Sequence, residues 1–341
     1  MDRTLGLRPL GRTGLQVTEI GLGTVPLGGL FAPVSEPAAR EVLNAAWAAG
    51  IRYVDTAPMY GIGRSERLTG DLLRERAGGV LSTKVGRLLV APRAGLDLAP
   101  PPPRNPLDPG WHNGLNFQEK FDYSHDGVMR SFEDSRQRLG MTAIDILLIH
   151  DIGRLTHGPL HDHHWAALTK GGGFRALEEL RANGDIRGFG LGVNETQAIH
   201  DAMDEADLDV CLLAGRYSLI DRQATSLMAK MQRHGVALVL GGVFNSGILA
   251  APKGTKATFD YAAAPPAIVA LVDQVRHICD AHDVPLGAAA LQFGLRHPAV
   301  SSVVLGVRSL AELDQNLGWH RHHIPDALWP EIDAVIGSGE S

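Results

Sequence analysis

The chain has 341 residues, 44% of them hydrophobic, and a formal net charge of −6. This length is ordinary for one barrel domain with insertions, and the acidic balance without any basic cluster argues against nucleic acid as a partner. No run approaches the ~20 apolar residues of a membrane span, the N-terminus MDRTLGL lacks a signal-peptide core, and Cys211 and Cys279 share no metal or redox spacing, so we expect a cytoplasmic protein with reduced thiols.

Strand-like and helix-like segments alternate along the chain, which favours a parallel sheet with helical crossovers. Residues 7–20 are expected to form a β-hairpin that turns near Thr13 and Gly14. Eight strands are predicted after it, at 19–24, 53–57, 80–85, 144–149, 186–192, 210–214, 236–241 and 301–305. Helices are predicted at 36–49, 65–75, 126–139, 173–183, 196–205, 222–234, 266–282 and 309–317, with a further helix near 325–336. We therefore predict a single domain over residues 1–341, an α/β fold of the (β/α)8 TIM-barrel type with an N-terminal hairpin and an extra C-terminal helix.

A doubly wound dinucleotide-binding sheet is the alternative α/β fold. Its best candidate fingerprint is Gly21-Leu22-Gly23, but Pro26 stands where the third glycine is needed and no helix opens there. The pattern therefore favours the barrel.

Two long segments interrupt the alternation. Residues 86–123 carry PPPRNP (101–106), and residues 151–170 carry His157, His161, His163 and His164. Both follow barrel strands, so both are expected to hang as loops over the barrel mouth. The histidines have no framework typical of a metal site, and we predict no bound metal.

Polar residues stand at the ends of three predicted strands. Asp55 and Tyr60 lie in YVDTAPMY (53–60), Lys84 ends VLSTK (80–84), and His150 ends IDILLIH (144–150). Because the C-terminal ends of barrel strands converge on one mouth, these side chains are expected to meet there. A phenol, an ammonium, a carboxylate and an imidazole together suit proton transfer coupled to redox chemistry at a carbonyl. Taken singly, Asp55 is also compatible with a turn cap, Lys84 with a solvated strand end, and His150 with a core histidine.

The motifs that contain these residues resemble those of the aldo-keto reductases. The resemblance runs from the start of the chain to about residue 317, and the DTAxxYG–SE block is its most specific part. The segments that carry it are GRTGLQVTEIGLGT (11–24), YVDTAPMYGIGRSE (53–66), LSTKVG (81–86) and IDILLIHD (144–151). Three further segments are more similar to the aldose 1-dehydrogenase branch, which includes D-threo-aldose and L-fucose dehydrogenases with a pyridoxal 4-dehydrogenase nearby: FDYSHDGVMRS (121–131), LLAGRYSL (212–219) and GGVFNSGIL (241–249).

The resemblance implies that Asp55, Tyr60, Lys84 and His150 form a catalytic tetrad. A tyrosine phenol ionises near pH ~10, too high for an efficient base at neutral pH. A close lysine cation is expected to lower the Tyr60 pKa, with Asp55 holding the Lys84 ammonium. Tyr60 then exchanges the proton, His150 orients the substrate oxygen, and a nicotinamide exchanges the hydride.

The resemblance also places a dinucleotide across the mouth, with its adenosine end at VVLGVRSLAELDQNL (303–317). Ser309 begins a predicted helix, whose free backbone N–H groups can bind phosphate. Alternatively, Ser309 and Glu312 form a capping box that stabilises the helix. A carboxylate at 312 disfavours a 2′-phosphate, so NAD is the expected cofactor, while Arg308 keeps NADP open. The predicted cofactor residues are Asn194, Gly306, Arg308, Ser309, Glu312 and Asn316.

The leading functional prediction is oxidation of the anomeric carbon C1 of a small aldose to the lactone by an NAD(P)-dependent oxidoreductase of carbohydrate metabolism. Trp111, His112 and Trp165 are the candidate substrate residues, because aromatic faces pack on sugar rings. The alternatives are a pyridoxal 4-dehydrogenase or general aldehyde reductase with the same tetrad, and a cofactor-sensing binding subunit. The expected partner is a small sugar or aldehyde, with no nucleic acid and no membrane.

Overall fold

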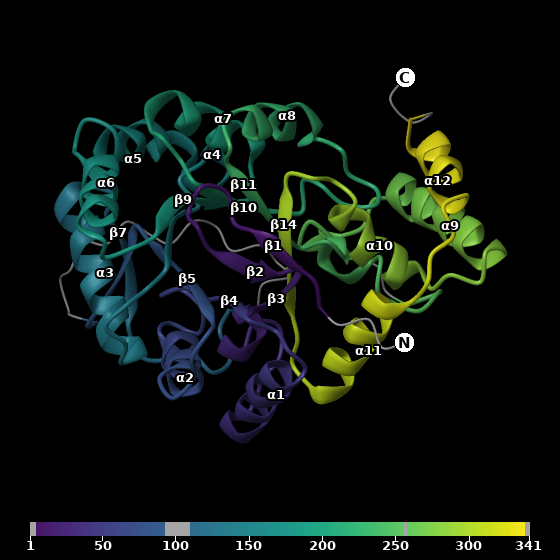
Figure 1. Cartoon of the computed structure of the whole chain (residues 1–341), viewed down its shortest axis with the longest axis horizontal. Helices are drawn as coiled ribbons and strands as arrows, with labels where there is room; N and C mark the ends of the chain where they lie inside the picture. Colours follow the sequence, from purple (N-terminus) through teal and green to yellow (C-terminus); the bar gives the residue numbers. More distant parts are fainter. Residues whose placement is uncertain (1–4, 93–109, 256–257, 338–341) are drawn as a thin grey trace.

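The computed structural model describes residues 5–92, 110–255 and 258–337. Its centre is a closed barrel of eight parallel strands, which confirms the predicted (β/α)8 fold (Figure 1). In order around the barrel the strands are β3 (Ile20–Gly23), β4 (Tyr53–Asp55), β5 (Val80–Val85), β8 (Ile146–His150), β9 (Gly188–Val193), β10 (Val210–Ala214), β11 (Ala237–Gly241) and β14 (Val300–Gly306), and β14 closes the ring on β3. All eight predicted strands are therefore present.

The strands are short apolar runs that are buried along nearly their whole length, as parallel strands under a layer of helices must be. Side chains that point inward fill the barrel, among them Tyr53, Ile146 and Val239. Side chains that point outward pack beneath the helices, among them Val54 and Leu147. Cys211 and Cys279 are free and buried in this structure.

A ring of helices surrounds the barrel (Figure 1). Its members are α1 (Glu36–Ala48), α2 (Arg64–Leu73), α3 (His125–Leu139), α6 (Gly173–Asn183), α7 (Thr196–Glu205), α8 (Thr225–Arg233), α9 (Pro266–Ala281), α10 (Leu286–Leu295) and α11 (Leu310–Arg321). The predicted C-terminal helix is present as α12 (Leu328–Gly337), and it packs on α9.

Helix α10 is absent from the sequence prediction, although it packs directly on β14 and α11. Its sequence LGAAALQFGL is apolar on almost every side, and nearly all of it is buried. An amphipathic period arises only where one face meets solvent, so a helix buried all round carries no such signal.

The segment 151–170 is helical, not a loop as expected. It forms α4 (Arg154–His157), the 3-10 turn η2 (Gly158–Leu160) and α5 (His161–Leu168). These helices are short and weakly amphipathic, so neither length nor period reveals them.

The long segment 86–123 begins and ends in a hairpin that the sequence did not indicate. Strand β6 (Arg87–Val90) pairs antiparallel with β7 (Gln118–Phe121). The PPPRNP motif (101–106) lies outside the described residues. A second small hairpin, β12 (Thr258–Phe259) and β13 (Ala262–Ala263), follows β11.

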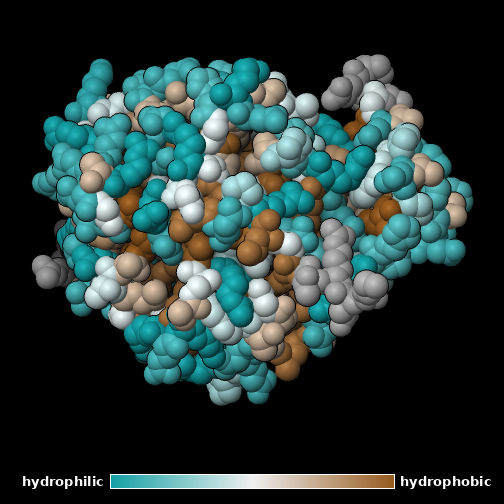
Figure 2. Space-filling view, in the orientation of Figure 1, coloured by the Kyte–Doolittle hydropathy of each residue, from teal (hydrophilic) through white to brown (hydrophobic). Residues whose placement is uncertain are grey.

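The N-terminal hairpin of β1 (Leu7–Pro9) and β2 (Gln16–Thr18) covers the end of the barrel at which the strands begin. Arg8 donates to the carbonyl of Val300 at 3.0 Å, and Ser301 donates to that of Pro9 at 2.7 Å. Figure 2 views this face, on which apolar side chains gather near the middle and polar ones dominate the edge. The opposite end of the barrel is left for the site. Within the described ranges, no helix is long and apolar enough to cross a bilayer.

Candidate active site

The structure brings Asp55, Tyr60, Lys84 and His150 together at the C-terminal ends of β4, β5 and β8. Lys84 Nζ lies 2.7 Å from Asp55 Oδ2 and 4.6 Å from the centre of the Tyr60 ring. The His150 ring meets the Tyr60 ring edge-on, with 5.8 Å between centroids. The four side chains therefore meet at the barrel mouth, as the positions of the predicted strand ends implied.

The Lys84–Asp55 pair is buried and fully bonded. Ser82 Oγ donates to the second Asp55 oxygen at 2.7 Å, and Lys84 also donates to the carbonyl of Thr56 at 3.0 Å. A side chain on Gly192 would place its Cβ only 3.0 Å from Lys84 Cε, so this glycine of β9 leaves the room that the lysine chain occupies. Lys84 is 1% exposed, which does not fit a solvated strand end.

Burial raises the pKa of Tyr60 well above its ordinary value, and the carboxylates of Asp55 and Asp151 raise it further, while Arg87 opposes them. This direction is opposite to the one expected from a neighbouring lysine. The main physical reason is burial, which penalises the phenolate, and the nearby carboxylate of Asp55, which is paired with Lys84 at 2.7 Å, acts in the same direction. In the protein without ligand the phenol is therefore protonated at neutral pH.

His150 is held neutral. Burial lowers its pKa well below the usual value, and the cations Arg87 and Lys84 lower it further. Its buried Nδ1 has no hydrogen-bond partner among the described residues, so it does not fit a satisfied core histidine. A neutral imidazole at the mouth can hydrogen-bond a substrate oxygen.

Two further charged residues border the tetrad, and the sequence analysis missed both. Arg87 donates to Asp151 Oδ2 at 2.6 Å, and the same oxygen lies 3.5 Å from His150 Nε2. Arg87 also contacts Glu119 at 3.2 Å and lies over the ring of Phe121. The available signal was a lone arginine inside the apolar run LSTKVGRLLV (81–90).

Ser65 and Glu66, the SE residues of the DTAxxYG–SE block, are not members of the tetrad. They stabilise the segments around the mouth. Ser65 donates to the carbonyl of Thr24 at 3.0 Å. Glu66 is fully buried, accepts from Thr83 at 2.7 Å and pairs with Arg138 at 2.5 Å. These bonds fix α2, and thereby the turn that carries Tyr60.

Asn194 follows β9 and lines a small hollow formed by the ends of β9, β10 and β11. The hollow measures about 20 Å³ and is bordered by Asn194, Ala214, Gly215, Arg216, Gly242, Asn245, Ser246, Asp260 and Tyr261. Arg216 Nε donates to the carbonyl of Asn194 at 2.9 Å, which places a cation beside this predicted cofactor residue.

The predicted adenosine end lies where β14 leads into α11. Ser309 caps the helix by accepting from the backbone N–H of Glu312 at 3.2 Å. Glu312 in turn accepts from the backbone N–H of Arg308 at 2.8 Å and pairs with its guanidinium at 2.9 Å. The capping interpretation is therefore present in the structure, and Arg308 and Glu312 compensate one another's charge.

Gly306 ends β14 at the surface, and a Cβ there would come within 2.9 Å of the Pro26 ring. Asn316 lies on α11 and is buried. The structure therefore places Gly306 at the open edge of the mouth and Asn316 on the inner side of the helix.

The three predicted substrate residues lie in different surroundings. The Trp111 ring lies 6.1 Å from the Tyr60 ring, at the site. His112 is exposed and contributes through its backbone, which donates to the carbonyl of Gly29 at 3.0 Å. Trp165 lies on α5, stacks on His161 and meets Phe174 of α6, so its place in the helical layer does not support a substrate contact.

The histidines of α4 and α5 pack together beside the site. The rings of His157 and His164 lie 4.2 Å apart, and His161 Nδ1 bonds the carbonyl of Ile152 at 3.1 Å. Across residues 5–92, 110–255 and 258–337, no three His, Cys, Asp or Glu side chains assemble into a metal-binding group.

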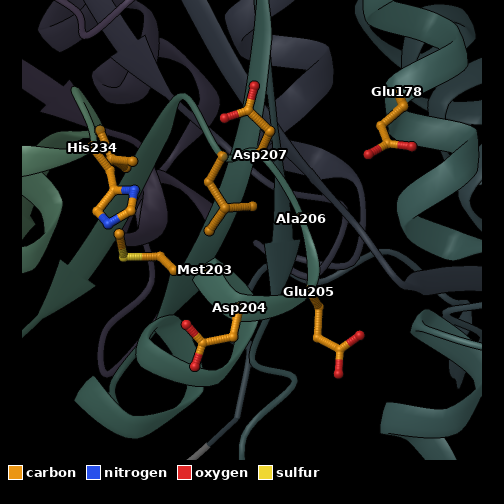
Figure 3. A pocket seen from close by; sticks show the side chains of 9 residues that line it. Glu178, Met203, Asp204, Glu205, Ala206, Asp207 and His234 are labelled. Atoms are coloured by element: carbon orange, nitrogen blue, oxygen red, sulfur yellow. The ribbon is translucent and has the colours of Figure 1, made fainter.

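A larger cavity, of about 340 Å³, opens at the other end of the barrel, where β10 and β11 begin. Figure 3 shows its acidic lining, which includes Glu178, Asp204, Glu205 and Asp207, with His234 on the opposite wall. Asp204 is paired with Lys230 at 2.6 Å. This cavity is remote from the tetrad and takes no part in its chemistry.

Comparison with known proteins agrees with this geometry. The model of the aldo/keto reductase family matches residues 19–336. A pyridoxal 4-dehydrogenase from Microbacterium luteolum is 61% identical over 327 residues, which cover 95% of this chain and 96% of the relative. A D-threo-aldose 1-dehydrogenase from a Pseudomonas species is 37% identical, with 94% of each chain covered. The solved structure of an aldo-keto reductase from Bacillus halodurans in its holo form has the same fold, with a TM-score of 0.74 at 24% identity over 97% of this chain and 96% of that chain. The chain therefore belongs to the aldo/keto reductase family of NAD(P)-dependent oxidoreductases.

Proposed function

We propose that this protein is an NAD⁺-dependent dehydrogenase that oxidises a cyclic hemiacetal carbon to a lactone, with pyridoxal as its principal substrate. The observation that carries the reaction type is the buried phenol of Tyr60 beside the ammonium of Lys84 and the neutral imidazole of His150. The choice of pyridoxal rests on the 61% identity to the Microbacterium relative, against 37% for the aldose 1-dehydrogenase.

Both substrate types present the same reacting group. The aldehyde of pyridoxal closes on its neighbouring hydroxymethyl group, and an aldose closes on one of its hydroxyls, so that each is a cyclic hemiacetal in water. Oxidation removes a hydride from the carbon and a proton from its hydroxyl, and it leaves a lactone. An aldose 1-dehydrogenase, the leading prediction from the sequence, thus becomes the second candidate here. A general aldehyde reductase remains the third.

The tetrad residues divide this reaction between them. Tyr60 accepts the proton of the hemiacetal hydroxyl in oxidation and returns it in reduction. His150 donates a hydrogen bond to the same oxygen and so orients it. Lys84 and Asp55 influence the ionisation of Tyr60, because their buried ion pair lies next to its phenol ring. A bound nicotinamide supplies the hydride acceptor.

The residues around the mouth fit such a cofactor. The exposed first turn of α11 offers backbone N–H groups to phosphates, and Arg216, which is paired with Asp260, holds the carbonyl of Asn194 in place. Asn194 offers an amide near the tetrad, Gly306 lies at the open edge, and Asn316 supports α11 from inside. We propose NAD over NADP, because the Glu312 carboxylate repels a 2′-phosphate and neutralises Arg308. On the sequence grounds given above, we also propose a cytoplasmic location.

A substrate scan tests the function. The purified enzyme is assayed for NAD⁺ reduction with pyridoxal, with L-fucose and with glyceraldehyde, and with Tyr60→Phe as the control for turnover by the site. We expect the highest kcat/KM for pyridoxal and a product two mass units lighter. A higher kcat/KM for the sugar would make the protein an aldose 1-dehydrogenase. Cofactor binding with no turnover of any substrate would favour the cofactor-sensing subunit.

A further inference from the structure

Two aromatic side chains from distant parts of the sequence meet above the mouth. Phe31 follows the first barrel strand and Tyr261 lies in the turn between β12 and β13, yet their rings stack with 6.2 Å between centroids and 24° between planes. We call this pair the aromatic roof. Phe31 is 42% exposed and Tyr261 is 40% exposed, so part of each side chain lies at the surface of the mouth.

The roof lies at the mouth that holds the reacting residues. Tyr261 borders the small hollow at the ends of β9, β10 and β11, together with Asn194. On the other side, Leu30, next to Phe31, forms a backbone bridge with Trp111, whose ring lies 6.1 Å from the Tyr60 ring. The Trp111 ring thus borders Tyr60, and the bridge from Leu30 to Trp111 ties the Phe31 side of the roof to the same part of the mouth.

The backbone under the roof is held in conformations that L residues rarely adopt. Phe31 has φ 64°, Asp260 has φ 46° and Tyr261 has φ 61°. Non-glycine residues in the left-handed region cost about 1–3 kcal/mol each and persist where their surroundings fix them, typically at functional sites. The strain is therefore an independent sign that these side chains are placed for a purpose.

Specific bonds hold both halves of the roof. The backbone N–H of Tyr261 donates to Ser246 Oγ at 2.9 Å, and Asp260 pairs with Arg216 at 2.9 Å. On the other half, Arg64 donates to the carbonyls of Leu27 and Val34, at 2.8 and 2.9 Å. The roof is therefore anchored to the barrel at each side.

Three polar side chains of the segments around the mouth are engaged within the protein. Asp260 is paired with Arg216, Asp151 with Arg87, and Asn113 Oδ1 accepts from the backbone N–H of Val34 at 2.7 Å. A sugar needs polar partners for its several hydroxyls, since a polar group that loses water without a replacement bond costs free energy. A flat aromatic ring needs ring faces, and offset stacking contributes about 0.5–1.5 kcal/mol per pair.

We propose that Phe31 and Tyr261 are specificity-determining residues, which stack on the planar heteroaromatic ring of the substrate and favour it over a sugar ring. This inference rests on the proposed function for its substrate, but the roof can be tested without that substrate. The probe is 3-hydroxypyridine, a planar ring that carries no oxidisable group, used as an inhibitor of L-fucose oxidation.

The experiment compares Phe31→Ala and Tyr261→Ala with Tyr261→Phe, which keeps the ring, and with Leu7→Ala, an exposed apolar side chain on the N-terminal hairpin at the far end of the barrel. We expect each alanine variant at the roof to raise the inhibition constant of 3-hydroxypyridine and the KM for pyridoxal about tenfold, with kcat and the KM for L-fucose changed by less than about threefold. Tyr261→Phe and Leu7→Ala should behave as wild type.

The two proposals fail in different ways. Oxidation of pyridoxal with unchanged KM and inhibition constants in both alanine variants would overturn the roof and leave the function in place. No oxidation of pyridoxal, together with inhibition by 3-hydroxypyridine that weakens in Tyr261→Ala, would overturn the function and leave the roof. An equal loss toward pyridoxal and L-fucose in the alanine variants would also contradict the proposal that the roof selects a planar ring.

Discussion

Lys84 and Asp55 form a salt bridge of 2.7 Å between side chains that are 2% and 3% exposed. A buried pair of this kind contributes little net stability, because its attraction is offset by lost hydration. Removal of one partner is strongly destabilising, because the other charge then stays buried without a compensating charge.

Lys84→Met should therefore lower the free energy of unfolding by about 3–5 kcal/mol. Denaturant unfolding of Lys84→Met, of Asp55→Asn and of the double variant measures this, and the double variant should lose much less than the sum. Arg154→Met is the matched control, because its ion pair with Asp162 is exposed, and it should change stability by at most about 1 kcal/mol. Additive losses in the double variant would contradict the paired role.

Tyr60→Phe should reduce turnover by about 10²–10⁴, the range typical of a lost general acid–base, with cofactor binding almost unchanged. Burial raises the pKa of Tyr60, so little of the phenol is deprotonated at neutral pH. Oxidation, which needs the deprotonated form, should therefore rise with pH into the alkaline range, while reduction, which needs the protonated form, should decline there. The rates of oxidation and reduction, measured between pH 6 and 11, check this expectation. The residual activity of Tyr60→Phe should show no such dependence on pH. In Lys84→Met the alkaline rise should move to still higher pH, because the Asp55 charge then acts on the phenol unopposed.

Arg87 is expected to be a positioning residue that keeps His150 neutral. Loss of its cation in Arg87→Met should raise the pKa of His150, because one of the charges that depress it is gone and Asp151 is left without its partner. Activity should then decline on the acid side at a higher pH than in wild type. Arg87→Lys should restore most of the pH profile, and Glu119→Gln, which alters the outer partner of Arg87, should leave it nearly unchanged. Identical profiles in wild type and Arg87→Met would exclude this role.

Glu312→Arg should shift cofactor preference toward NADP⁺ by about tenfold or more, since it removes a like charge and adds a bond to phosphate worth roughly 1.5–3 kcal/mol. The kcat/KM values for both cofactors measure this shift. The helix-capping role predicts a loss of stability as well, because Glu312 accepts a hydrogen bond from the backbone N–H of Arg308. Glu312→Gln separates the two effects, because it keeps an acceptor for the backbone and removes the charge. A wild-type preference for NADP⁺ would instead point to Arg308 as the phosphate ligand.

His157 should make the protein less stable in mild acid. Burial, with the neighbouring His164, lowers the pKa of His157 to about 3, whereas an unfolded histidine ionises near pH ~6.5. Between these two values the unfolded chain takes up a proton that the folded chain does not, so stability falls as pH falls through this window. His157→Gln should weaken this dependence in urea unfolding at pH 7 and pH 5. His125 is the control of opposite sign, because bonds to Glu179 and Asp126 raise its pKa and its contribution is lost as pH rises.

The sequence by itself determined the barrel and the four tetrad positions. Each strand is a short apolar run, and a polar residue at the end of such a run is brought to the mouth by the strand's own direction, as at Asp55, Lys84 and His150. These properties depend on short stretches of sequence, so they can be predicted without knowledge of tertiary contacts. Tyr60 lies beyond the end of its strand, so the family motif DTAxxYG, and not the strand direction, pointed to it.

Only the tertiary structure decided which residues surround the tetrad. Helix α10 lacks a period because it is buried all round, and β7 is a polar strand, QEKF, whose partner β6 lies 28–34 residues away in the register that joins Arg87 to Phe121 and Val90 to Gln118. Arg87 and Asp151 are 64 positions apart, and Phe31 and Tyr261 are 230 positions apart (261 − 31). The direction of the Tyr60 pKa was also beyond the sequence, since it depends on burial and on the nearby carboxylate of Asp55. Pairing across the barrel and loss of water are properties of the folded chain, and no local pattern of residues encodes them.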